Sequence, residues 1–144
     1  MKVSVIIPSL NPDEKLICVV DSLREAGFDD IILVNDGSDE NHREPFEHAS
    51  AYPECTILTH EVNKGKGRGL KTAFEYCIKN RPDIDGVVTV DGDNQHKAAD
   101  ILKLVKMRKW LSRLAQVRAG QLFLFVIGSF DFCAFGKRQM KIWM

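Results

Sequence analysis

The stretch VSVIIPSLNPDEKLICVVDSLREAGFDDIILVNDGS, residues 3–38, contains the pattern that decides the fold. It opens with a short β-branched run, Val3 to Ile7, which Pro8 closes and which is typical of a buried strand. A second apolar run, Ile31 to Val34, lies near the end of the stretch. Between the two runs, apolar side chains recur at the spacing of an amphipathic helix, at Leu16, Val19, Val20 and Leu23. The stretch therefore predicts a strand, a helix and a strand.

The ends of this first helix carry signals of their own. Asn11, Pro12 and Glu14 fit the N-cap, first and third positions of a helix. Gly27 fits the cap at the other end. The turn-rich segment Asn35 to Asp39 follows the second strand, and we expect a short helix after it.

The alternation of strands and helices continues along the chain. Cys55 to Leu58 and Val87 to Val90 are further apolar runs. Between them, a helix is predicted by the spacing of Leu70, Ala73, Phe74, Cys77 and Ile78. Strands that are apolar on both faces and alternate with helices predict an α/β fold, with a mostly parallel sheet and helices on both faces. In such a fold, the loops at the carboxyl ends of the strands build the site.

One of those loops carries two acidic residues. Asp91, Gly92 and Asp93 follow a buried strand directly, and in an extended turn residues i and i+2 point to the same side. Two carboxylates so placed suit Mg²⁺ or Mn²⁺, which proteins commonly bind with one or two carboxylates plus phosphate oxygens of a substrate. The alternative is an ordinary solvated turn, because Asp and Gly are common turn residues.

Two more loops carry polar groups. Asp36, after the second strand, has a carboxylate that suits a hydrogen bond from a base or a ribose hydroxyl, although an Asx turn is the alternative. The glycine-rich segment Asn63 to Gly69 precedes a helix and holds Lys64, Lys66 and Arg68, so it suits a diphosphate, although an ordinary basic loop is the alternative. It is not a P-loop, because Leu70 stands where the second glycine of that motif belongs.

The histidines and cysteines give weaker signals. His42, His48 and His60 are expected at the surface, since no pair of histidines has the spacing of metal ligands. The four cysteines are far apart and form no C-x-x-C pair, which favours neither a zinc site nor a disulfide framework. A reducing cytoplasm is the expected location.

Taken in order, four segments resemble glycosyltransferase family 2, with the closest likeness to its dolichyl- or polyprenyl-phosphate sugar transferases. They are Ile6 to Asn11, Val34 to Ser38, Asn63 to Gly67 and Asp91 to His96. The resemblance implies the GT-A fold of enzymes that bind nucleotide-diphosphate sugars. It also implies a position for each part of such a donor.

By this resemblance, the base and ribose lie near Pro8, Asn11 and Asp36. The diphosphate lies near Lys64, Lys66 and Arg68. The metal, Mg²⁺ or Mn²⁺, lies on Asp93, with Asp91 beside the ribose or the metal. The resemblance names no catalytic base in this chain.

The expected function is transfer of a sugar from a UDP- or GDP-sugar to a lipid phosphate, such as polyprenyl phosphate, or to another acceptor. The alternative is a truncated donor-binding module with little or no transferase activity. The sequence leaves open the donor's sugar and nucleotide, the acceptor and the oligomeric state.

The C-terminal third differs in charge from the rest of the chain. Residues 1–96 hold 10 Lys and Arg against 18 Asp and Glu, whereas residues 97–144 hold 10 against 2. The resemblance stops after Val105, so we expect the nucleotide-sugar-binding half at residues 1–105 and an atypical basic tail at residues 106–144. A truncated or frameshifted gene would leave the GT-A fold incomplete at the C-terminus in this way.

We expect a helix from Ala98 to about Gln116 and an apolar strand from Leu122 to Phe135 in this region. The basic residues would suit peripheral attachment at the inner face of a membrane. The tail is only weakly amphipathic, which argues against a protein whose sole role is to dock on a membrane or nucleic acid through this tail. No nucleic-acid partner is expected. The longest apolar run, Leu122 to Ile127, is too short to span a bilayer.

Overall fold

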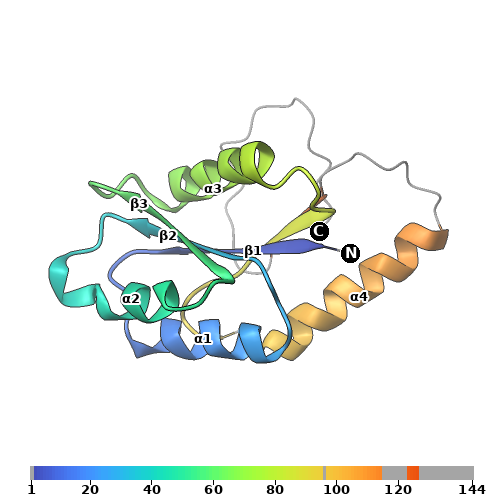
Figure 1. Cartoon of the computed structure of the whole chain (residues 1–144), viewed down its shortest axis with the longest axis horizontal. Helices are drawn as coiled ribbons and strands as arrows, with labels where there is room; N and C mark the ends of the chain where they lie inside the picture. The colour runs from blue at the N-terminus through green and yellow to red at the C-terminus, as the bar shows by residue number, and fades with distance from the viewer. Residues whose placement is uncertain (1, 96, 115–122, 127–144) are drawn as a thin grey trace.

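The computed structural model describes residues 2–95, 97–114 and 123–126 of the 144-residue chain (Figure 1). Their strands form one sheet in the order β3-β2-β1-β4-β5, in which every neighbouring pair is parallel. The strands are β1 (Val3–Ser9), β2 (Ile31–Asp36), β3 (Cys55–His60), β4 (Gly86–Thr89) and β5 (Phe123–Val126). The predicted parallel sheet is confirmed.

The helices cover both faces of the sheet, as the sequence predicts. They are α1 (Glu14–Glu25), α2 (Glu44–Ser50), α3 (Lys66–Asn80) and α4 (Ala98–Leu114), with a short 3₁₀ turn, η1 (Glu40–His42), before α2. Figure 1 shows α3 on one face and α1, α2 and α4 on the other. This arrangement confirms an α/β fold consistent with the GT-A class.

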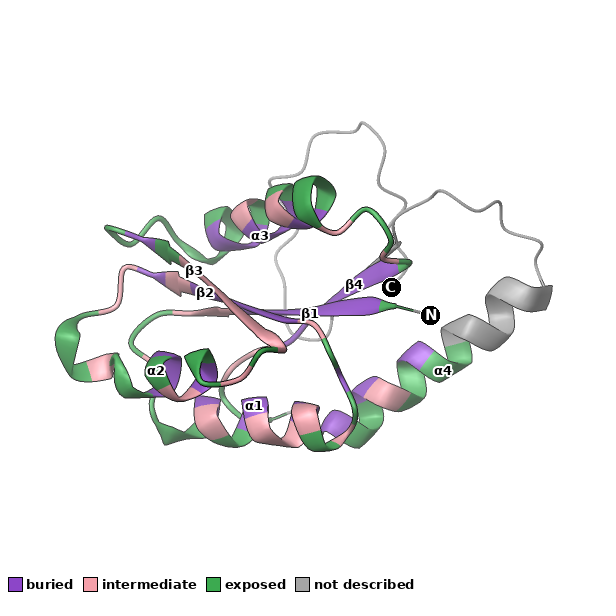
Figure 2. Cartoon of the chain, in the orientation of Figure 1, coloured by how far each residue is buried: buried purple, intermediate pink, exposed green. Residues whose placement is uncertain are grey.

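Successive residues of β1 face two different cores. On β1, Val5 and Ile7 pack with the buried face of α1, whereas Ile6 between them packs with α3. All three side chains are fully buried. Figure 2 shows β1 coloured as buried over most of its length. Each face of the strand removes apolar area from water, at roughly 25 cal/mol per Å². The unbroken apolar run of β1 follows from this burial on both faces.

The first helix begins later than the sequence predicts. Its N-cap is Asp13, whose carboxylate accepts a hydrogen bond from the Lys15 backbone N–H at 3.0 Å. The prediction of Asn11 as N-cap was wrong, because that residue has a left-handed backbone (φ 47°) and its side chain binds another loop. The cap at Gly27 is confirmed: it has φ 87°, and the Phe28 N–H reaches back to the Leu23 carbonyl.

The helix and the strand predicted in the C-terminal region are confirmed only where the structure describes them. The helix predicted to reach about Gln116 ends at Leu114 as α4, and residues 115–116 lie outside the described part. Of the strand predicted from Leu122 to Phe135, residues 123–126 form β5 beside β4, and the others lie outside. In the described ranges no helix combines the length and the hydropathy needed to cross a bilayer.

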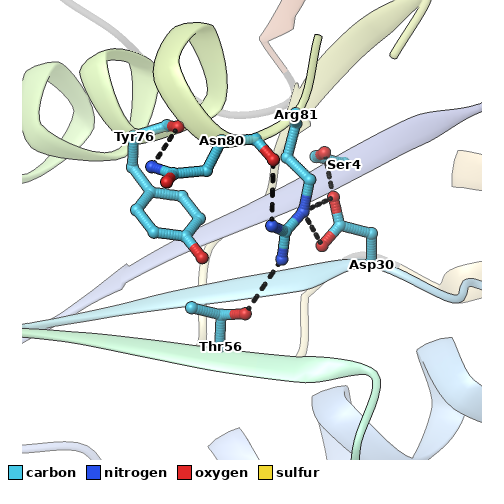
Figure 3. Close-up of polar contacts among 6 residues, drawn as sticks. All are labelled: Ser4, Asp30, Thr56, Tyr76, Asn80 and Arg81. Carbon is cyan, nitrogen blue, oxygen red and sulfur yellow. Dashed lines mark hydrogen bonds and ion pairs between the residues drawn. The ribbon is translucent and has the colours of Figure 1, made fainter. Parts of the chain in front are cut away.

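Polar side chains tie the strands together at the amino end of the sheet (Figure 3). Arg81, just after α3, donates from Nε to both carboxylate oxygens of Asp30, at 3.1 and 3.2 Å, and from Nη2 to Thr56 Oγ1 at 3.3 Å. The Ser4 hydroxyl of β1 also donates to Asp30. Burial alone would lower the pKa of Arg81, but the hydrogen bond and charge of Asp30 outweigh burial and raise it. We call these four residues the amino-end clamp.

Candidate functional site

A cavity of about 360 Å³ lies at the carboxyl end of the sheet. It is lined by the loops after β1 and β4 and by the first residue of α3. Five of the predicted site residues line it: Pro8, Asn11, Lys66, Asp91 and Asp93. The structure therefore brings together residues from three separate segments of sequence at the edge where the fold predicts a site.

The loops after β2 and β3 touch because of a glycine. Gly37 has φ 78°, and a Cβ built on it would lie 2.4 Å from the Asn63 nitrogen and 2.4 Å from the Val62 carbonyl carbon. Only glycine fits both the left-handed backbone and this close approach. Gly92 also allows a close approach, although a less tight one, since a Cβ built on it would lie 3.1 Å from Ser9 Oγ.

Hydrogen bonds also join the loops after β1 and β2. The Asn11 N–H donates to Ser38 Oγ at 2.9 Å, and the Asp39 N–H donates to Asn11 Oδ1 at 3.0 Å. Within the second loop, the Ser38 N–H donates to Asn35 Oδ1 at 2.9 Å. Asn11, expected beside the ribose, thus also fixes the wall of the cavity against the neighbouring loop.

Asp36 is the last residue of β2 and is 3% exposed. Its Oδ1 accepts from the Lys64 backbone N–H at 3.0 Å and lies 2.6 Å from Nδ1 of His60. Burial by itself raises the pKa of this carboxyl, but the hydrogen bonds from His60 and from the backbone of Lys64 and Gly65 lower it below its ordinary value. Asp36 is therefore an ionised group held in place from two sides.

The prediction of a surface position for His60 was wrong. This side chain is 7% exposed, and its ring contacts Asp36 and, from Nε2, Thr72 Oγ1 at 3.0 Å. The missed signal is strand alternation. His60 lies two residues after Leu58 of the same strand, so both side chains face α3. The strand was predicted to end at Leu58, and a strand ending there hides this relation.

The glycine-rich loop leads into α3, whose N-cap residue is Gly65 (φ 86°). No side chain caps this helix end, so its first N–H groups point towards the loop with the partial positive charge of a helix N-terminus. Lys64 and Arg68 are exposed on either side of it, and Lys66 forms an ion pair with Asp91. The cavity lining includes Lys66 but not Lys64, Arg68 or Asp36.

Asp91 and Asp93 have oxygen donors of the kind that Mg²⁺ and Mn²⁺ prefer. Asp91 already pairs with the ammonium group of Lys66, and Asp93 Oδ1 accepts from the Gln95 N–H at 3.1 Å. Within the described residues, no group of three or more His, Cys, Asp or Glu side chains is placed to hold a metal. A metal ion on Asp91 and Asp93 therefore stays a prediction, and it would need its other ligands from a phosphate-bearing substrate.

Residues 4–113 match glycosyl transferase family 2, and the chain belongs to this family. One relative is a UDP-N-acetylglucosamine–dolichyl-phosphate N-acetylglucosaminyltransferase from Methanococcus voltae, 30% identical over 118 residues. The match covers 70% of this chain and 45% of the relative. An undecaprenyl-phosphate 4-deoxy-4-formamido-L-arabinose transferase from Pectobacterium carotovorum is 31% identical over 111 residues, covering 72% of this chain and 32% of the relative.

A glycosyltransferase from Haloferax volcanii is 27% identical over 103 residues, which cover 72% of this chain and 31% of that protein. The chain spans less than half the length of each of these three relatives. The resemblance to family 2 predicted from the sequence is confirmed. Two of the three relatives act, by name, on a polyprenyl phosphate.

Proposed function

We propose that this chain binds a nucleotide-diphosphate sugar, UDP- or GDP-linked, in the carboxyl-end cavity and serves in transfer of the sugar to a polyprenyl phosphate. One observation carries the proposal: a cation, Lys66, and two carboxylates, Asp91 and Asp93, line the same cavity. A metal-bound diphosphate needs both kinds of charge. Family membership and the names of the relatives support the same reaction.

In this proposal the N-terminus of α3 holds the diphosphate. Its uncapped N–H groups attract an anion, and the exposed Lys64, Lys66 and Arg68 add positive charge. Asp36 accepts a hydrogen bond from the base or the ribose, and Pro8 and Asn11 lie near the same part of the donor. The base and the diphosphate then lie on neighbouring loops that are already joined through Gly37.

Asp91 and Asp93 would hold Mg²⁺ or Mn²⁺, as is typical of GT-A enzymes. When bound, the ion supplies Lewis acidity that offsets the negative charge growing on the departing diphosphate. Lys66 neutralises Asp91 before the donor arrives and turns to the phosphate oxygens afterwards. The chain's own residues thus bind the diphosphate, orient it and balance its charge.

Calorimetry with UDP and GDP, each with Mn²⁺ or with EDTA, tests donor binding and the metal together. Binding that needs Mn²⁺ is the expected result. Lys66→Met should weaken it about tenfold, whereas Lys71→Met, in the same helix but outside the cavity lining, should leave it unchanged. Equal affinity in EDTA would remove the metal from the proposal, and no binding of either nucleotide would overturn it.

Transfer itself is tested with a radiolabelled UDP- or GDP-sugar and polyprenyl phosphate in mixed micelles. The expected product is a lipid-linked sugar whose formation Asp93→Asn abolishes. An acceptor with a polyprenyl tail also implies that the reaction takes place at a membrane surface, on the side where nucleotide sugars are available. Hydrolysis of the donor without any lipid product would instead support a module that binds the donor but does not transfer the sugar.

A further inference from the structure

We propose that His60 is a positioning residue: it fixes the Asp36 carboxylate for recognition of the donor's base and couples that carboxylate to helix α3. The inference rests on the proposed function, because it assigns Asp36 to the nucleotide. It adds a residue outside the four segments by which the chain resembles its family. His60 itself touches no donor in this proposal.

Both ring nitrogens of His60 have partners. Nδ1 lies 2.6 Å from Asp36 Oδ1, and Nε2 lies 3.0 Å from Thr72 Oγ1. The acidic partner requires the proton on Nδ1, since an ionised carboxylate only accepts. The side chains of His60 and Asp36 are 7% and 4% exposed, so water competes little for this hydrogen bond. The ring is thus locked in one orientation between β2 and α3.

The Asp36 carboxylate is held by hydrogen bonds to Oδ1, and the backbone of Gly65 is a further hydrogen-bond partner of this side chain. Oδ1 accepts from the His60 ring and also from the Lys64 backbone N–H at 3.0 Å. Two donors from different directions fix the torsion of the carboxylate as well as its position. We assign the other oxygen, Oδ2, to the ligand, where it accepts a hydrogen bond from the N–H of a base such as uracil or guanine.

The position of this network in the fold argues for a role beyond stability. Asp36 and His60 are paired residues at the carboxyl ends of β2 and β3, the end where the cavity lies. Lys64 belongs to the loop that leads into α3, and Thr72 lies inside α3. A single buried ring therefore connects the carboxylate proposed for the base with the helix proposed for the diphosphate.

Two substitutions of His60 distinguish the roles of its two hydrogen bonds. In His60→Asn, the side-chain amide lies near the place of Nδ1 and keeps the hydrogen bond to Asp36. In His60→Gln, the longer side chain places its amide near Nε2, which keeps the contact with Thr72 and removes the one with Asp36. The pair is matched in polarity, and each variant retains one hydrogen bond of the wild type.

The test compares binding of UDP and GDP with binding of inorganic pyrophosphate, all with Mn²⁺, by calorimetry on the 144-residue chain. Pyrophosphate has no base and reports on the diphosphate site alone. We expect His60→Gln to weaken the better nucleotide about tenfold and to leave pyrophosphate unchanged, because one charge-assisted hydrogen bond loses its orientation. His60→Asn should keep the wild-type ratio of the two affinities.

Thermal unfolding and proton NMR serve as the companion measurements. In the wild type, nucleotide should shift the Nδ1–H resonance of His60 and pyrophosphate should not, a result that needs no variant to fold. Losses of nucleotide affinity that are equal in the two variants, or that pyrophosphate shares, would overturn the inference and leave a structural role for His60. Wild-type chain that binds pyrophosphate but no nucleotide would overturn the proposed function itself.

Discussion

The two ends of the sheet handle charge in opposite ways. At the amino end, the guanidinium of Arg81 has its partners inside the chain, Asp30 and Thr56, and a cavity of about 290 Å³ beside them is lined by the same Arg81 and Asp30. At the carboxyl end, Lys66, Asp91 and Asp93 line a cavity of about 360 Å³. The charged groups at the amino end thus contribute to cohesion, whereas in the proposed function those at the carboxyl end bind the donor.

Helix α3 takes part in both arrangements. It begins at Lys66, beside the carboxyl-end cavity, and Arg81 of the amino-end clamp follows its last residue, Asn80. With 15 residues at 1.5 Å each, it is about 22 Å long. The comparison teaches that substitutions in the clamp should change stability, whereas charge substitutions at the cavity should change binding. The following experiments test that division.

The largest effect on stability should come from a substitution at the carboxyl end, Gly37→Ala. It would be an exception to the division between stability at the amino end and binding at the carboxyl end. Gly37→Ala forces a Cβ to within 2.4 Å of backbone atoms and keeps a positive φ, so we expect a loss of about 3 kcal/mol of unfolding free energy. Gly27→Ala is the matched control, with φ 87° but nothing within 4 Å of the new Cβ, and should lose about 1 kcal/mol. Urea unfolding measures both. Equal losses would show that the contact between the loops contributes nothing.

The next effect lies in the amino-end clamp. Arg81→Met leaves the Asp30 side chain, 16% exposed, without its cation, and should reduce the unfolding free energy by about 2 kcal/mol. Combining it with Asp30→Asn should recover part of that loss in a double-mutant cycle. Arg43→Gln, which removes an exposed pair with Glu40, should have no measurable effect. Additive losses in the cycle would contradict the clamp.

A smaller effect concerns acid sensitivity at Asp36, whose pKa is lowered in the folded chain. An acid with a lowered pKa adds stability above its unfolded pKa of about 3.9, and this part is lost as the pH falls through the folded pKa. Asp36→Asn should therefore flatten the fall in stability below about pH 4. Unfolding curves at several pH values measure the slope. Identical acid slopes for the two proteins would contradict the lowered pKa.

The smallest effect on stability should come from the residue with the largest effect on binding. Asp93 is exposed, so Asp93→Ala should change the unfolding free energy by less than about 0.5 kcal/mol while abolishing the Mn²⁺ dependence of nucleotide binding. Asp83→Ala, another exposed carboxylate at the opposite end of the sheet, is the control and should change neither quantity. A large fall in melting temperature for Asp93→Ala would support an ordinary structural turn instead.

Local patterns were sufficient to predict most of the fold. The β-branched run of β1 and the spacing of Leu16, Val19, Val20 and Leu23 depend on burial, and burial imposes a period on the sequence. The start of α1 was misjudged because Asn11 and Asp13 are both good caps, and the choice between them depends on a distant residue, Asp39, that binds the Asn11 side chain.

The candidate site was predicted only in part, because some of its contacts depend on residues far apart in the sequence. Asp91, Asp93 and Lys66 follow strands or begin a helix, so topology alone brings them to one cavity. The buried network of Asp36, His60 and Thr72 joins three elements through side chains, and its existence depends on the register of β2 and β3. Strand alternation after Leu58 indicates that His60 faces α3, but no short-range pattern encodes the register that places it beside Asp36.

The central place of β1 has a consequence for how the chain folds. This strand precedes both of its neighbours, β2 and β4, in the sequence, and Val3 pairs with Gly86. Pairings between residues so far apart in sequence form slowly, because a long loop must close before they contribute anything. On the ribosome, the apolar run Val3 to Ile7 must therefore wait for most of the domain to emerge, and during that time it is the segment most in need of protection from aggregation.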